Sequence, residues 1–436
     1  MAIFIVIALS VLCVFSTVHW YLWRRLVRDV SAPGSGYRRI GTALAFALPV
    51  LAVCAQLAER LGMPFPVQQI LAWPGFLWFA LLVYLLLALL VLEPVRPLVR
   101  RALERRDARR PVTGETESLG PLGQSSIAAT GTAAGTAGGG VDLRRRTAVA
   151  APAGSRDMQP QPSRRLFIAR AAAVTAGTVA ATTVGYGAYS VVGAGPKLKR
   201  VRIPLAKLPR GAHGYRIAVV SDIHLGPILG RAHTQRIVDI INKTSPDLIA
   251  IVGDLVDGSV ANLGPAAEPL AQLTARDGAY FVTGNHEYFS GAGEWVDHVR
   301  ELGIRPLRNE REELRHFDLA GVNDVAGENY GDGPDFDKAL GDRDISRASV
   351  LLAHQPVQIH DAVRRGVDLQ LSGHTHGGQM WPGNILADLA NPTLAGLERY
   401  GDTQLYVTRG AGTWGPPVRV GAEADITVVE LAAKQA

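Results

Sequence analysis

Three long apolar runs occupy the first part of the chain, over residues 2–23, 40–58 and 67–92. Each run is close to or above the ~20 residues that a helix needs to cross a bilayer. A helix buried in a soluble core is the weaker interpretation, because arginines flank the runs in the way that fixes membrane orientation. We therefore predict a transmembrane anchor of three spans over residues 1–93.

The orientation of this anchor follows from its arginines. Positive charge favours the cytoplasmic side of a membrane, and the loop around Glu59 and Arg60 is nearly neutral. The pattern predicts an N-terminus outside the cytoplasm, a cytoplasmic first loop, an external second loop and a cytoplasmic segment after residue 92. The arginines that follow the first and third runs are Arg24, Arg25, Arg28, Arg38, Arg39, Arg96, Arg100, Arg101, Arg105, Arg106, Arg109 and Arg110.

Residues 94–165 are rich in Ala, Gly, Thr, Pro and Ser and predict a disordered linker. Residues 166–195 follow the pair Arg164-Arg165 and form a weakly apolar run, typical of a twin-arginine export signal or a fourth span. Both interpretations place the remaining chain outside the cytoplasm, whereas a surface-lying helix would leave it inside. We expect a multi-pass protein of the cell membrane with an extracytoplasmic C-terminal domain.

The C-terminal part, residues 199–436, alternates short apolar strands with helices, which predicts an α/β domain. Five of its strand-like runs end in residue types that bind metals. One such residue after a strand usually has a structural role. Five instances at the carboxyl ends of strands, where α/β sheets place their ligand-binding sites, indicate a metal site. These residues are Asp222, His224, Asp254, Asn285, His354, His374 and His376.

Glycines and cysteines refine this picture. Gly253, Gly284 and Gly373 each precede a candidate ligand, at a sharp turn where glycine tolerates a positive φ. The two cysteines, Cys13 and Cys54, both lie in the apolar runs, so the C-terminal domain has no thiolate to offer. Carboxylate, amide oxygen and imidazole together favour a divalent Mn, Fe, Zn or Co ion.

The chain carries a net charge of +6, which raises the question of nucleic-acid binding. Many of its arginines flank apolar runs, and no interleaving of aromatic and basic residues is present. We therefore expect no nucleic-acid partner. No pattern indicates a protein partner.

The order Asp-x-His, Gly-Asp, Gly-Asn-His-Glu, a separate His and Gly-His-x-His resembles the calcineurin-like metallophosphoesterase superfamily. Residues 253–258 (Gly-Asp-Leu-Val-Asp-Gly), residues 374–379 (His-Thr-His-Gly-Gly-Gln) and residues 415–419 (Gly-Pro-Pro-Val-Arg) are similar to its membrane-associated bacterial branch. The resemblance implies a four-layer α/β/β/α sandwich, here preceded by an α-helical transmembrane region. It implies two divalent ions and makes His286 the catalytic residue. Trp381 and Trp414 become candidates for lining the substrate cleft. The first ion would be bound by Asp222, His224, Asp254 and His376, and the second by Asp254, Asn285, His354 and His374.

The implied function is metal-dependent hydrolysis of a phosphomonoester, phosphodiester or pyrophosphate bond by a two-metal mechanism. A membrane anchor favours lipid-linked substrates. Two other functions remain open: a non-catalytic metal-binding sensor on a membrane anchor, and a transporter with an appended domain. The transporter fits less well, because no charged residue lies in the middle of the first three apolar runs.

Overall fold

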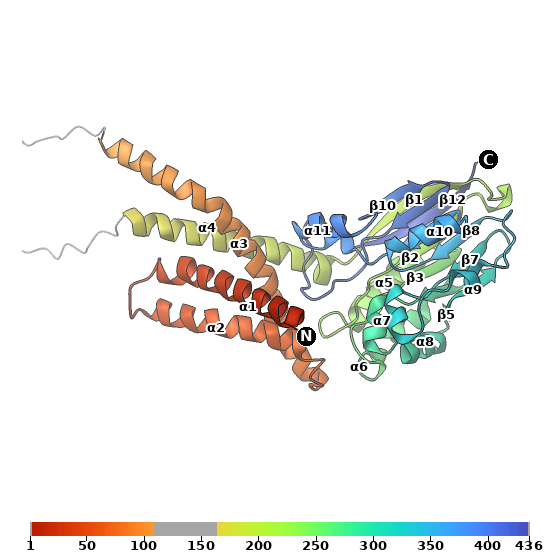
Figure 1. Ribbon diagram of the computed structural model, residues 1–436, viewed down its shortest axis with the longest axis horizontal. Coiled ribbons are helices and arrows are strands. Elements are labelled where there is room, and N and C mark those ends of the chain that lie inside the picture. The colour runs from red at the N-terminus through yellow and green to blue at the C-terminus, as the bar shows by residue number, and fades with distance from the viewer. Residues whose placement is uncertain (1, 109–163, 435–436) are drawn as a thin grey trace, which may run out of the picture.

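The protein is seen in a computed structural model that describes residues 2–108 and 164–434. Its N-terminal part is a bundle of long helices, and its C-terminal part is a sandwich of two sheets (Figure 1). The bundle consists of α1 (Ala2–Trp23), α2 (Gly36–Leu57), α3 (Phe65–Ala108) and α4 (Arg164–Ala188), with π-helical turns η1 (Arg24–Arg28) and η2 (Tyr189–Ala194).

Three segments of the described chain are long and apolar enough to cross a membrane: Gly36–Leu57, Phe65–Ala102 and Arg164–Ala194. The last segment matches the fourth-span alternative by its length and composition. Helix α1 covers the first apolar run with 22 residues. Ala172, Ala176 and Ala180 recur at every fourth position along α4 and are buried, because small side chains allow neighbouring helices to approach closely.

The segment expected as a linker from residue 94 begins as a helix, because α3 continues to Ala108. Its last turns are rich in Arg, Leu, Ala and Glu, which are strong helix formers, so polarity alone does not end the helix there. Pro94 and Pro97 lie within this helix. The remainder of the expected linker, residues 109–163, lies outside the described residues.

The C-terminal part contains two six-stranded sheets. In each sheet, the strands whose ends carry candidate ligands are parallel to one another, so those ends meet at the same edge. The first sheet has the order β1 (Lys197–Leu205), β12 (Asp425–Ala433), β2 (Tyr215–Val220), β3 (Leu248–Val252), β4 (Ala279–Val282), β5 (Arg305–Pro306). The second has the order β10 (Gly396–Tyr400), β11 (Thr403–Val407), β9 (Leu369–Ser372), β8 (Ser349–Leu352), β7 (Asp318–Gly321), β6 (Glu310–Glu313).

Four layers result from the way these sheets are covered. The largest apolar cluster joins residues such as Val219 and Leu248 of the first sheet to Leu319 and Val350 of the second, so the sheets pack face to face. The outer faces are covered by α5 (Arg231–Lys243), α6 (Val260–Ala267) and α8 (Ala292–Glu301) on the first sheet and by α9 (Phe336–Leu340) and α10 (Ile359–Arg364) on the second. This arrangement confirms the predicted α/β/β/α sandwich. The remaining short helices are α7 (Asn285–Ser290), α11 (Gly383–Ala390), η3 (Arg210–Ala212), η4 (Glu268–Gln272), η5 (Val325–Tyr330), η6 (Pro356–Gln358) and η7 (His376–Gly378).

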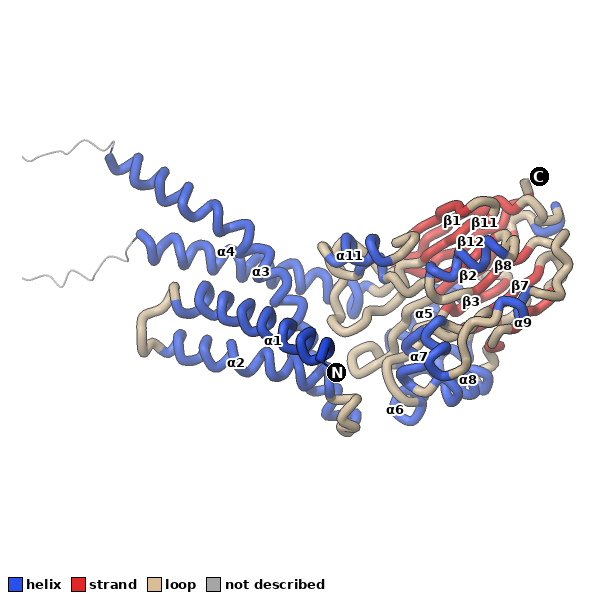
Figure 2. Tube along the Cα trace, in the orientation of Figure 1, coloured by secondary structure: helices blue, strands red, loops and turns tan. Residues whose placement is uncertain are grey.

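The bundle and the sandwich are in direct contact. Helix α4 leads through η2 into β1, and Met380, Val418 and Val420 of the sandwich pack into the apolar cluster of the bundle. The N-terminus lies at the sandwich end of the bundle, whereas the α1–α2 connection, the end of α3 and the start of α4 lie at the opposite end (Figures 1 and 2). The arginine-rich segments are therefore farthest from the sandwich.

Candidate metal centre

The carboxyl ends of five strands meet at one edge of the sandwich. Strands β2, β3 and β4 of the first sheet lead to Asp222 and His224, to Asp254 and to Asn285. Strands β8 and β9 of the second sheet lead to His354 and to the pair His374 and His376. The structure thus brings the predicted residues of both sheets to one place.

The turns after these strands have unusual backbone geometry. Asp222, His224, Asp254, His374 and His376 all have φ between 49° and 72°, a region that non-glycine residues rarely occupy. Such strain persists only where surrounding structure imposes it, and it clusters at functional sites. Here it occurs at five of the seven predicted ligands.

The glycines before the ligands have two different explanations. Gly253 has a φ of 77°, as expected for a glycine turn. Gly284 and Gly373 do not have positive φ; they are required because a Cβ at Gly284 would overlap the Asp254 carboxylate, and one at Gly373 would overlap the Ser221 hydroxyl. For these two positions the expectation of a positive φ is wrong, and close approach of another strand-end turn is the reason for glycine.

Asp222, His224 and His376 form the first group of candidate ligands, and all three are buried. Nε2 of His224 lies 3.0 Å from Nε2 of His376, which in turn lies 3.4 Å from Oδ1 of Asp222. Two imidazole nitrogens and a carboxylate oxygen therefore converge on one small volume. A cation with nitrogen ligands at about 2.0–2.1 Å fits this convergence.

Asp254, His354 and His374 form the second group. Nε2 of His354 lies 3.1 Å from Oδ2 of Asp254 but makes no hydrogen bond. The same oxygen lies 3.8 Å from Nε2 of His224, between the two groups. Oδ1 of Asn285 is also buried without a hydrogen-bond partner in the described structure. Because buried polar atoms without partners are costly, these atoms fit a bound cation.

Contacts at Nδ1 of His354 and His224 orient these rings with Nε2 toward the candidate metal positions. Nδ1 of His354 lies 2.8 Å from the carbonyl oxygen of Val252, and Nδ1 of His224 lies 3.0 Å from Oδ1 of Asp257. Such hydrogen bonds orient the ring and leave the other nitrogen for a metal. Burial first, and the charge of His354 second, lower the pKa of His374 to about 4. His374 is therefore neutral near pH 7, as metal binding requires.

Asp257 is a site residue to which the sequence motif assigned no role. Its Oδ1 lies 2.6 Å from Nδ1 of His286 as well as 3.0 Å from His224. Burial would raise the pKa of Asp257, but His224 first and His286 second lower it to about 2. Burial would lower the pKa of His286, but Asp257 raises it to about 9. Asp257, His224 and His286 could also hold a cation; their own hydrogen bonds already satisfy them.

Glu287 and Arg419 support the site from behind. The buried Glu287 carboxylate accepts hydrogen bonds from the backbone N–H groups of Asp254 at 3.0 Å, Leu255 at 2.7 Å and Gly284 at 2.6 Å, which ties two ligand turns together. Nη1 of the buried Arg419 donates to the carbonyl oxygen of His376, and Nη2 lies 3.1 Å from its Nδ1. Both residues lie in motif segments, but only the tertiary contacts show what they hold.

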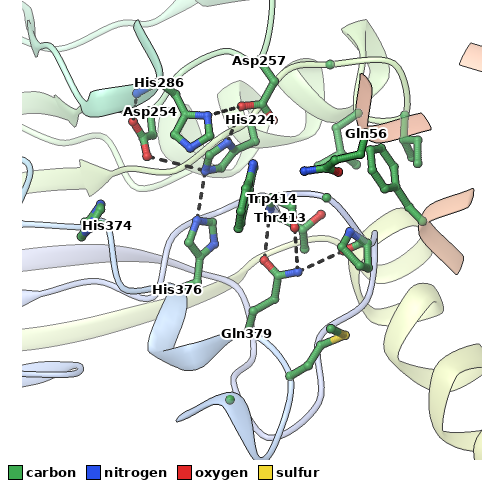
Figure 3. A pocket seen from close by; sticks show the side chains of 18 of the residues that line it. Gln56, His224, Asp254, Asp257, His286, His374, His376, Gln379, Thr413 and Trp414 are labelled. Carbon is green, nitrogen blue, oxygen red and sulfur yellow. Dashed lines mark hydrogen bonds and ion pairs between the residues drawn. The ribbon is translucent and has the colours of Figure 1, made fainter. Parts of the chain in front are cut away.

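A cavity of about 1340 Å³ opens in front of the candidate ligands. Trp414 lines it and lies with its ring centroid 5.9 Å from that of His286, whereas Trp381 is not among the lining residues (Figure 3). The opposite wall comes from the bundle, with Gln56 of α2 and Glu59 of the α2–α3 turn. Sequence patterns gave no sign of this contribution, because the bundle and the site are far apart along the chain.

Comparison with known proteins places this site in a family. Residues 215–378 match the family described as calcineurin-like phosphoesterase. A protein of Aquifex aeolicus described as an uncharacterized metallophosphoesterase is 34% identical over 243 residues, which cover 55% of this chain and 92% of that protein. The chain belongs to the calcineurin-like metallophosphoesterases. The resemblance inferred from its motifs is thereby confirmed.

A second relative is matched over a smaller share of its own length. The transmembrane protein with metallophosphoesterase domain of Danio rerio is 42% identical over 259 residues, which cover 56% of this chain and 59% of that protein. The chain therefore spans less than two thirds of this relative's length. Among solved structures, a dimetal phosphatase from Danio rerio aligns with 50% of this chain and 93% of its own, at 12% identity and a TM-score of 0.33.

Proposed function

We propose that this protein is a membrane-anchored phosphoesterase that hydrolyses phosphomonoester, phosphodiester or pyrophosphate bonds with two divalent metal ions. The observation that carries the proposal is the pair of ligand groups around Asp254. One of its oxygens lies 3.1 Å from His354 in one group and 3.8 Å from His224 toward the other. A carboxylate in this place can face two cations at once.

The ligand set follows from this geometry and from the family motif. One ion would be held by Asp222, His224, Asp254 and His376, and the other by Asp254, Asn285, His354 and His374. Such ions, when bound, polarise a phosphoryl group and activate water for attack on phosphorus. The orphaned oxygen of Asn285 and the hydrogen-bond-free Nε2 of His354 support this assignment.

His286 is the proposed catalytic residue, acting as a general acid. It lines the same cavity as the ligands, and its Nδ1 is held by Asp257. Asp257 raises the pKa of His286 to about 9 against the effect of burial, so the ring is protonated near pH 7. Its Nε2 proton can then pass to the leaving oxygen as the ester bond breaks.

The proposed location is the cell membrane, with the sandwich outside the cytoplasm. The arginine-rich ends of the helices lie at the end of the bundle away from the sandwich (Figure 1). Positive charge favours the cytoplasmic side, which leaves the sandwich on the other side. The name of the Danio rerio relative, a transmembrane protein, agrees with a membrane location.

The test uses the full chain in nanodiscs, stripped of metal and resupplied separately with Mn, Zn, Fe or Co. Hydrolysis of para-nitrophenyl phosphate and of its bis-ester is measured, with Asn285→Ala as the defective variant and Asn391→Ala, in the loop after α11, as the matched control. Metal-dependent turnover that only Asn285→Ala loses would support the proposal. A folded, metal-loaded protein without turnover on either ester would instead favour the non-catalytic sensor.

A further inference from the structure

The cavity at the metal centre has two ends of different chemistry. One end is formed by ligands such as His224, Asp254 and His376. The other runs along α3, where Gln68, Phe76 and Val83 line it. At 1.5 Å per residue, Gln68 and Val83 lie about 22 Å apart along the helix. The cavity therefore extends from a polar site to the apolar part of a candidate membrane span.

Its size exceeds what a phosphate group requires. The volume of about 1340 Å³ is above the roughly 300–1,000 Å³ of ordinary small-molecule pockets. The α2–α3 region also lines the cavity with Gln56, Glu59 and Arg60, which offer both hydrogen-bond donors and acceptors. The cavity thus combines metal ligands, polar side chains and an apolar wall. An amphiphilic phosphoester has the corresponding groups: a phosphate, a polar headgroup and an apolar chain.

Helix α11 borders the same cavity and is unusually apolar on its exposed side. Ile385, Leu386 and Leu389 are 54%, 72% and 82% exposed, and no residue of this helix is buried. Ile385 and Leu386 also line the cavity. Exposed apolar groups of this kind mark a binding surface or a membrane contact.

The position of α11 decides between those two possibilities. Met380, three residues before the helix, packs into the apolar cluster of the bundle together with residues of α3 and α4. Helix α11 lies beside the sandwich end of the bundle (Figure 1). With the bundle across a membrane, the exposed face of α11 lies at the level of the lipid surface, where amphipathic helices bury their apolar side.

We propose that this cavity binds a lipid phosphoester from the adjacent leaflet, with its phosphate at the metal centre and its acyl chain between α3 and α11. The proposal rests on the proposed function and names the substrate class of that site. The transmembrane helices are then part of the substrate pocket as well as an anchor. The polar residues of the α2–α3 region contact the headgroup, between the phosphate and the chain.

Alkylphosphonates test the acyl site directly, because their carbon–phosphorus bond resists hydrolysis. The series from ethyl- to octylphosphonate is titrated by calorimetry into the metal-loaded full chain in nanodiscs. Each buried methylene should tighten binding roughly threefold to fourfold. Leu386→Asp should flatten this dependence. Ile345→Asp, equally exposed at 72% but outside the cavity, should leave it unchanged.

A second measurement asks whether the ligand comes from the bilayer. Nanodiscs that contain a phosphonate analogue of phosphatidate should weaken the apparent binding of octylphosphonate, whereas pure phosphatidylcholine nanodiscs should not. Binding that does not depend on chain length, or no competition from the bilayer analogue, would overturn the inference. Metal-dependent turnover of para-nitrophenyl phosphate with flat binding would leave the proposed function intact, and chain-dependent binding without turnover would reject only the catalytic proposal.

Discussion

The carboxylate of Asp257 lies 2.6 Å from Nδ1 of His286. The same oxygen contacts Nδ1 of His224, a candidate metal ligand, at 3.0 Å. One half-buried acid therefore orients both the proposed general acid and a ring of the metal centre. It also keeps His286 protonated, because the negative charge favours the imidazolium and outweighs burial.

Replacing Asp257 by Asn should lower the pKa of His286 from about 9 toward its ordinary value. A general acid works only while protonated, so the alkaline limb of the kcat/KM profile should move to lower pH. At neutral pH the rate should fall roughly 10- to 100-fold, as for other outer-shell partners. The measurement is the pH profile of kcat/KM for the metal-loaded protein. An alkaline limb at its original pH would show that Asp257 does not raise the pKa of His286.

Asp254→Ala should disturb both metal positions, since the carboxylate lies between the two ligand groups. We expect metal content to fall below one ion per chain, and activity to fall by more than the roughly hundredfold cost of losing an outer-shell partner. Asp222→Ala should lose one ion and retain the other. Elemental analysis of the purified variants measures this, and two ions retained in Asp254→Ala would contradict the shared position.

Glu287→Gln should destabilise the sandwich without touching substrate. The carboxylate accepts three backbone N–H groups, whereas a glutamine amide presents an N–H₂ group toward some of these donors. A buried backbone N–H group left without its acceptor costs about 1–3 kcal/mol, so a loss of about 2 kcal/mol is expected. Thermal unfolding measures it, with the exposed Glu301→Gln as control. Equal unfolding temperatures in both variants would argue that the three hydrogen bonds of Glu287 do not stabilise the fold.

Trp414→Ala should change the ratio of monoester to diester hydrolysis, because Trp414 lines the cavity next to His286. Trp381→Ala is the matched control, since Trp381 is 51% exposed against 54% for Trp414 and does not line the cavity. Steady-state kinetics on both esters supply the ratio. The assignment fails if both variants change the ratio alike.

The orientation can be tested by thiol labelling in a chain without Cys13 and Cys54. Leu61 is 65% exposed and lies in the turn between α2 and α3, on the side of the sandwich, so Leu61→Cys supplies one labelling site. Ala32→Cys lies in the exposed connection between α1 and α2, at the arginine-rich end. A membrane-impermeant maleimide should label the first in intact cells and the second only after permeabilisation. The reverse pattern would place the sandwich in the cytoplasm.

The sequence alone predicted the long helices, the strands and the edge at which the candidate ligands gather. The long apolar runs have the length of helices that cross a bilayer. The short apolar runs form strands, and polar residues follow their carboxyl ends. Asp222, Asp254 and His354 therefore meet as expected, because parallel strands bring like ends to one edge. Helix α3 extends past its apolar run, since a charged segment such as that around Arg100 can continue a helix when its residues favour helix formation.

Only the tertiary structure decided the contacts between elements that are distant in sequence. The roles of Asp257, Glu287 and Arg419 depend on which backbone groups and rings the folded turns place within hydrogen-bond distance. The contribution of Gln56 and Phe76 to the cavity depends on how the bundle packs against the sandwich. Local periodicity reports how a segment buries its own face, and it contains no information about the partner that this face will meet.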